Sequence, residues 1–241
     1  MQSERVDALE SPVVATAKLN GYSVKETMSK RQRQNGSATP RQSRGSGDKR
    51  ERILSAAVRV FANKGFYATR VSEIAEAAGV ADGTIYLYFK NKDHVLVSIF
   101  EDRLDALIAL LEREIGATES VQEQIEKIVY LQLHLLESER DLAEVITINL
   151  RQSSRLLKEY AAPKFRRYLE IIAEVIAAGQ SQGAFREELH PFDAARALWG
   201  SLDGVLMTWA LGEAKPAALR RASTAVASIF LRGLAADQPE P

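Results

Sequence analysis

The chain has 241 residues, of which 46% are hydrophobic and 27% charged, with three histidines and no cysteine. This composition is typical of a globular protein, and it excludes disulfides, thiolate metal sites and a cysteine nucleophile. No apolar run reaches the roughly 18 residues that a membrane span needs, and the first residues lack the apolar segment of a secretion signal. We therefore expect a cytoplasmic protein with no membrane partner.

The formal net charge is zero, but the charges are unevenly distributed along the chain. Residues 1–48 carry eight basic and five acidic side chains, residues 49–93 carry the same numbers, and residues 94–241 carry sixteen and twenty-two. A basic N-terminal part, residues 1–93, followed by an acidic remainder indicates that the N-terminal part binds a polyanion. The alternative is a chance scatter of charges over solvated surfaces.

The first 47 residues show little apolar periodicity, and from Met28 onward they are rich in Ser, Gly, Gln and Arg. Such a segment cannot bury enough apolar area to offset the entropy of ordering it, so we expect residues 1–47 to be a disordered basic extension. Its basic side chains would add unspecific attraction to phosphates, or would have no role.

Three helices are predicted in the next part of the chain. From Asp48 apolar residues recur at spacings of three and four, and Gly65 is a plausible stop. A short second helix opens near Thr69 and ends at Gly79, where the chain must turn sharply. A third helix, about two turns long, begins at Ala81.

The rest of the chain also has the apolar pattern of helices. Asn91 is a good N-cap for a fourth helix that continues to Gly116. Further helices are expected over roughly 118–137, 141–160, 163–182, 191–212 and 216–236. No segment is typical of a strand. The sequence therefore predicts an all-α fold with two domains, one over residues 48–93 and a larger one over residues 94–236.

Two short helices joined by a tight turn, after a longer helix, form the helix-turn-helix arrangement, whose second short helix enters the major groove of DNA. In a helix that starts near Ala81, Ile85 and Phe89 face inward and their neighbours face outward. The expected DNA contacts are Arg70, Ser72, Asp82, Gly83, Thr84, Tyr86, Tyr88 and Lys92. Lys92 is expected to bind a phosphate, because the positive end of a helix dipole lies there. Half-buried packing is the alternative for the two tyrosines.

Residues 49–96, with VSEIAEAAGVADGTIYLYFKNKDHVL at their centre, resemble the DNA-binding domain of the TetR family of bacterial transcriptional regulators. The usual form is I-A-x-x-A-G-V-S-x-G-T-I-Y-x-Y-F-x-x-K. The chain departs from it at Ala81, where Ser is usual, so a helix cap has to come from another residue, with Asp82 the candidate. The resemblance implies a homodimeric, all-helical regulator that leaves its operator when a small molecule binds in the C-terminal domain.

The last two predicted helices carry broad apolar faces. Two such helices from each of two chains would form a four-helix bundle and close a twofold dimer. A dimer would present two reading helices to half-sites about 34–36 Å apart. An internal bundle in a monomer is the alternative.

The segment over residues 118–182 combines apolar helix faces with a basic series. An apolar site beside several arginines would suit an amphiphile with an acyl chain and an anionic head, because Arg binds phosphate through two parallel hydrogen bonds. Ordinary core packing and a solvated helix face would explain the same pattern.

The segments ADGTIYLYFKNK, INLRQSS (148–154) and GSLDGVLMTWAL (200–211) together resemble the TetR-type regulators of fatty-acid degradation, the FadR group. These repress β-oxidation genes and are released by long-chain acyl-CoA. The resemblance implies that Arg151, Gln152 and Asp203 lie in the ligand pocket or at its rim. It also implies that Arg155, Arg166 and Arg167 contact the CoA phosphates. The candidate effector residues are Arg151, Gln152, Arg155, Arg166, Arg167, Tyr168 and Asp203.

Other functions are less well supported by the sequence. The histidines His94, His134 and His190 have no metal-ligand spacing and no Ser-His-acid arrangement, and no phosphate-binding glycine loop occurs, so we expect neither an enzyme nor a metal or cofactor. A ligand-free architectural DNA-binding module would not need so many apolar-faced helices. A repressor of efflux genes that senses cationic or lipophilic drugs stays open, because Glu144, Asp203 and two tryptophans would suit such ligands.

Overall fold

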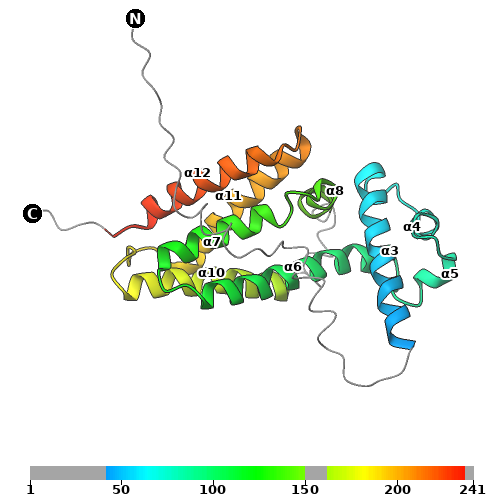
Figure 1. Cartoon of the computed structure of the whole chain (residues 1–241), viewed down its shortest axis with the longest axis horizontal. Helices are drawn as coiled ribbons and strands as arrows, with labels where there is room; N and C mark the ends of the chain where they lie inside the picture. Colours follow the sequence, from blue (N-terminus) through cyan, green and yellow to red (C-terminus); the bar gives the residue numbers. More distant parts are fainter. Residues whose placement is uncertain (1–41, 150–161, 237–241) are drawn as a thin grey trace, which may run out of the picture. The chain divides into compact units, whose positions relative to one another are not determined.

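The computed structural model describes residues 42–149 and 162–236. Within these ranges the chain is helical, and the one β-type feature is an isolated bridge between Phe185 and Ala235. The all-α prediction is confirmed. The helices, in chain order, are α3 (Gln42–Lys64), α4 (Val71–Ala78), α5 (Asp82–Ile85), α6 (Lys92–Gly116), α7 (Val121–His134), α8 (Arg140–Glu144), the π-helical segment η1 (Val145–Asn149), α10 (Ala162–Ser181), α11 (Pro191–Leu211) and α12 (Pro216–Leu234) (Figure 1).

We call α3, α4 and α5 the head, and α6 to α12 the body. The head packs around apolar side chains that are fully buried, with Ile53 and Phe61 from α3 and Ile74 from α4. These belong to one hydrophobic cluster that continues into the body. In the body, α10 packs against α6, α7 and α11, while α12 packs against α7 and α11. Since head and body share one core, a change of packing in one bears directly on the other.

Helix α6 connects the two parts (Figure 1). Its N-cap is Asn91, as predicted, and the Asn91 Oδ1 atom accepts a hydrogen bond from His94 N at 2.8 Å. Near the middle of α6, Asp102 accepts two bonds from the Arg50 guanidinium of α3, at 2.6 and 3.0 Å. The helix ends at Gly116, which is also as predicted. Within the described residues, no helix is long and apolar enough to cross a membrane.

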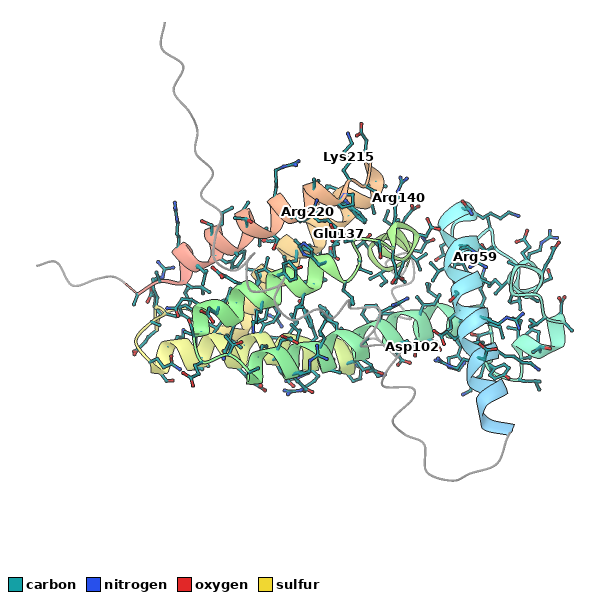
Figure 2. The ribbon with its side chains drawn as sticks, viewed as in Figure 1. Arg59, Asp102, Glu137, Arg140, Lys215 and Arg220 are labelled. Carbon is teal, nitrogen blue, oxygen red and sulfur yellow. The ribbon has the colours of Figure 1, made fainter. Side chains whose placement is uncertain are left out.

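Polar contacts join the outer helices of the body. Arg220 of α12 lies beside Glu137, just beyond α7, with the charged groups 2.7 Å apart (Figure 2). The Arg140 Nε atom at the start of α8 donates to Ala210 O of α11 at 3.0 Å. A surface ion pair of this kind contributes at most about 1 kcal/mol, so apolar burial dominates the stability of the body.

Several boundaries differ from the sequence-based expectations. Helix α3 begins at Gln42, six residues before the predicted start at Asp48. The long helix predicted over 141–160 is the short α8 followed by η1, and residues 150–161 lie outside the described part. One cause is local: the Thr147 hydroxyl donates to Ala143 O at 2.7 Å, and such bonds back to the preceding turn compete with regular helix geometry. Residues 1–41, most of the predicted disordered extension, also lie outside the described part.

Candidate DNA-binding head and effector site

Helix α4 is short because both of its ends are well defined. Its apolar side buries Ile74 and Ala75 against the head core. At its start, Glu73 accepts a hydrogen bond from Arg70 N at 2.9 Å and forms an ion pair with Lys64. At its end, Gly79 has a left-handed backbone with φ of 64°, a conformation that favours glycine. The sharp turn that the sequence predicted at Gly79 is therefore confirmed.

The candidate recognition element is shorter than predicted. Helix α5 contains only Asp82–Ile85, and the next turn is held mainly by bonds between residues three apart, from Leu87 N to Thr84 O and from Tyr88 N to Ile85 O. The expectation of a helix two turns long is therefore wrong in its second turn. The N-cap position, Ala81, has no side-chain cap, so Asp82 does not replace the usual serine cap. Its carboxylate instead lies in the first turn, where the helix dipole favours negative charge.

Two apolar anchors fix the recognition element on the head. Ile85 is fully buried and Phe89 is 2% exposed, as the spacing of four predicted. The Phe89 ring also packs edge-on against His94 at a centroid distance of 5.7 Å, and the Arg50 guanidinium lies over it at 5.7 Å. These contacts set which side chains of the element face solvent.

The predicted DNA-contacting side chains of this element differ in exposure. Tyr86 is 59% exposed, and Asp82 and Gly83 are exposed as well. Thr84 and Tyr88 are half-buried. The outward direction predicted for Tyr86 is confirmed, whereas its contact with DNA stays a prediction. At the start of α4, Arg70 and Ser72 are both exposed.

Sequence reasoning missed Leu87 as a candidate. Its side chain is 80% exposed, between Tyr86 and Tyr88 on the recognition element. A single exposed leucine needs no explanation on most surfaces. Next to a candidate DNA-reading side chain, however, it is suited to contact a thymine methyl group. The signal was present in the sequence, since Leu87 is neither of the two inward residues of the predicted helix.

Lys92 has partners that the sequence did not predict. Its Nζ atom donates to the carbonyl oxygens of Phe66, Tyr67 and Thr69 at 2.7, 3.1 and 2.8 Å, and it lies 4.6 Å from the centre of the Phe66 ring. The ammonium therefore binds the loop between α3 and α4. A phosphate contact from Lys92 stays a prediction, and it would have to compete with these carbonyls.

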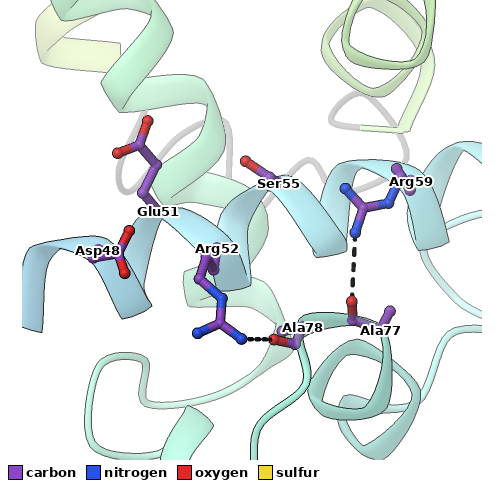
Figure 3. Close-up of a pocket in the computed structure, with 7 residues that line it drawn as sticks. All are labelled: Asp48, Glu51, Arg52, Ser55, Arg59, Ala77 and Ala78. Carbon is purple, nitrogen blue, oxygen red and sulfur yellow. Dashed lines mark hydrogen bonds between the residues drawn. The ribbon is translucent and has the colours of Figure 1, made fainter. Parts of the chain in front are cut away.

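Two arginines of α3 bind the end of α4. Arg52 donates to Ala78 O at 2.7 Å and Arg59 to Ala77 O at 3.4 Å, across a shallow hollow between the two helices (Figure 3). The last carbonyls of a helix carry partial negative charge, so these guanidinium groups stabilise the end of α4 and the turn that follows. Part of the positive charge of the head thus holds the reading element in place.

The candidate effector residues fall into three groups. Tyr168 is buried in the body, and its hydroxyl donates to the side-chain oxygen of buried Gln132. Burial raises the pKa of Tyr168 far above its usual value, and the negative charge of Asp203 raises it further. Tyr168, Gln132 and Asp203 therefore bring polar groups from α7, α10 and α11 into the body.

The two candidate arginines of α10, Arg166 and Arg167, form ion pairs with glutamates. Arg166 is paired with Glu170 at 3.0 Å, and Arg167 with Glu174 at 2.7 Å and Glu112 at 3.2 Å. Both side chains lie at the surface rather than beside Tyr168, so a CoA headgroup would reach them only from outside. That contact stays a prediction. Arg151, Gln152 and Arg155 lie outside the described residues.

The described residues contain no group of three or more His, Asp or Glu side chains that could hold a metal ion. His134 stacks on Tyr130 at a centroid distance of 3.8 Å, and its Nδ1 atom lies 2.9 Å from Tyr130 O. Burial lowers its pKa, which favours the neutral ring. These contacts are those of a packing residue.

A three-helix head with a glycine turn, two buried anchors and an exposed aromatic reading element defines a helix-turn-helix DNA-binding protein. Residues 53–99 match the family described as bacterial regulatory proteins, tetR family. Residues 100–233 match the family described as YsiA-like protein, C-terminal region. The chain therefore belongs to the TetR family of transcriptional regulators.

Three known proteins are similar over most of the chain. A fatty acid metabolism regulator protein of Bacillus subtilis is 34% identical over 163 residues, which cover 68% of this chain and 84% of the relative. The solved structure of the fatty acid degradation regulator FadR from Bacillus halodurans is 34% identical, with a TM-score of 0.71, and covers 76% of this chain and 98% of its own. FadR from Bacillus subtilis in complex with stearoyl-CoA is 33% identical, with the same TM-score and coverage.

Proposed function

We propose that this chain is a repressor of fatty-acid degradation genes, and that long-chain acyl-CoA releases it from its operator. The similarity to FadR proteins across both head and body carries the proposal, since a regulator that shared only the head would share no effector chemistry. One of these relatives was crystallised with stearoyl-CoA, which favours the same class of ligand here. The protein would act in the cytoplasm, where acyl-CoA and operator DNA are both present.

The head geometry supports the DNA-binding part of the proposal. Tyr86 and Leu87 are exposed, while Ile85 and Phe89 anchor the same short element. Phosphate contacts would come from exposed basic residues around this element, such as Arg70 and Lys90. We take residues 48–93 as the DNA-binding domain and residues 94–236 as the ligand-binding and dimerisation domain.

The body supports the dimer part of the proposal through α11 and α12. Among the described residues, Leu211 of α11 is 63% exposed and Ile229 of α12 is 67% exposed, and Phe230 is half-buried. Apolar side chains on these two helices would be covered in a four-helix bundle with a second chain. A twofold dimer would present two heads to a twofold-symmetric operator.

The interior polar groups support the effector part. A purely apolar core would not contain the buried pair Tyr168 and Gln132, with the negative charge of half-buried Asp203 acting on Tyr168, because buried polar groups have to find partners. An amphiphile that extends its acyl chain between the helices of the body would contact these three residues. The anionic head of the ligand would remain near the arginines at the surface.

Thermal unfolding with four ligands tests the proposal. At a hundred times its Kd, palmitoyl-CoA should raise the Tm by roughly 5–10 °C. Free palmitate and CoA alone should have much smaller effects, because each supplies only one half of the amphiphile. Stabilisation by a cationic dye but not by palmitoyl-CoA would contradict the proposal and favour the efflux-gene alternative.

A further inference from the structure

One buried hydrogen bond joins the body to the head across a long stretch of chain. The side-chain oxygen of Asn149, the last residue of η1, accepts a bond from Phe66 N at 2.9 Å. The two residues are 83 positions apart in sequence, and each is only 3% exposed. A buried amide N–H has to find an acceptor, and here the body supplies it to a loop of the head.

The loop that receives this bond connects α3 to α4. It begins at Gly65, whose φ of 77° ends α3, and Gly65 O accepts a bond from the Thr69 hydroxyl at 2.8 Å. Lys92 donates to the carbonyl oxygens of Phe66 and Tyr67. The backbone of Phe66 is therefore fixed at both its N–H and its C=O, and α4 starts a few residues later.

The position of the Asn149 side chain depends on the unusual geometry of η1. A π-helical turn contains one residue more than an α-helical turn, and such turns are frequent at functional sites. Each residue of an α-helix turns the chain by about 100°, so converting η1 to regular helix would rotate Asn149 away from Phe66. A change of this segment from π-helix to regular α-helix would therefore break the bond and couple the body to the loop of the head.

We propose that Asn149 is a positioning residue that sets the operator affinity of the head according to the state of the body. In the arrangement described here, the bond to Phe66 holds the loop and α4 in the DNA-binding geometry. Effector binding in the body weakens the bond, and the head loses its operator. The effector part rests on the proposed function, whereas the effect of Asn149 on operator binding does not depend on it.

Three variants test the role of this residue. Asn149→Leu keeps the branched skeleton of the side chain and removes the acceptor, and it should weaken operator binding about tenfold in fluorescence anisotropy without effector. Asn149→Asp keeps a side-chain oxygen at the same place and should bind within about threefold of the wild type. Thr147→Val is the matched control, since it removes another buried polar group of η1, whose hydroxyl donates to Ala143 O in the body. It should lower the Tm but leave operator affinity unchanged.

The contribution of the effector is measured with palmitoyl-CoA in the same assay. The fold-loss of operator affinity that palmitoyl-CoA causes should be several times smaller in Asn149→Leu than in the wild type, because the bond is already absent. If palmitoyl-CoA has no effect on the wild type, the proposed function fails, and the effector-free affinities still decide the role of Asn149. If Asn149→Leu does not fold, hydrogen exchange of the Phe66 amide in the wild type is measured in place of the variant's affinity. Phe66 N–H should be protected, and palmitoyl-CoA should reduce that protection.

Some results would overturn the inference. One is operator binding by folded Asn149→Leu within twofold of the wild type. Another is an equal loss in Thr147→Val, which would indicate a general effect of damaging η1. Unchanged protection of Phe66 on release of the operator would also contradict it.

Discussion

Tyr86→Ala should weaken operator binding by at least tenfold and leave the free energy of unfolding within about 0.5 kcal/mol of the wild type. The ring is 59% exposed, so it contributes little to the core, whereas the anchors Ile85 and Phe89 keep the element folded. In a dimer the loss occurs at both half-sites. Fluorescence anisotropy with operator DNA and thermal unfolding measure the two quantities.

The matched control is Tyr130→Ala. Tyr130 lies in α7, outside the head, and is 38% exposed. The same change of side chain there should leave operator affinity unaltered. If Tyr86→Ala binds the operator as well as the wild type does, the proposed reading element is wrong.

Lys92→Met should destabilise the protein by about 1–3 kcal/mol, which lowers the Tm by several degrees. The variant loses a charged donor that serves the carbonyl groups of Phe66, Tyr67 and Thr69, and water replaces it only in part because the site is half-buried. Operator binding should weaken through the loosened loop. If these carbonyls keep the ammonium when the operator is bound, the slope of log K against log salt should not change.

Lys90→Met is the comparison for this prediction. Lys90 is exposed on the same turn, and its loss should leave the Tm unchanged while reducing the salt slope by about 0.9 if it meets one phosphate. The opposite pattern, with an unchanged Tm and a smaller slope in Lys92→Met, would show that Lys92 binds DNA as the sequence suggested. Unfolding and salt titration of both variants therefore separate the structural role from the electrostatic one.

Local signals predicted the head and most helix ends. Asn91 and Gly116 bound α6 as expected, because a capping side chain and a terminal glycine act through their own neighbours. Gly79 marked the turn, since few other residues adopt its backbone angles. The spacing of Ile85 and Phe89 identified the buried side of the reading element.

Features that depend on contacts between distant residues could not be predicted from the sequence. The stretch over 141–160 carries no local sign of the π-helical turn at η1, which adds only about one residue to a turn. Asn149 carried no local sign that its partner would be Phe66, 83 residues earlier. For Lys92, the sequence predicted a phosphate contact because this residue begins a helix. It did not predict the carbonyl partners of Lys92 in the loop after α3.

The neighbours of the candidate effector residues within the chain could not be predicted from the sequence. A basic series beside apolar helix faces suggested one site for both halves of an amphiphile. In the structure, Arg166 and Arg167 pair with glutamates at the surface, and Tyr168 is buried with Gln132, while their contact with an effector stays a prediction. The helical period shows which residues share a face, but it does not show which charges on neighbouring helices will pair with them.

Recovery of bound fragments from genomic DNA, with and without palmitoyl-CoA, tests the central claim most directly. The wild-type protein should enrich twofold-symmetric sites, with half-sites about one helical turn of DNA apart, next to genes of fatty-acid degradation. Palmitoyl-CoA should release these fragments, and CoA alone should not. Enrichment of no particular sequence, or sites that palmitoyl-CoA leaves occupied, would contradict the account.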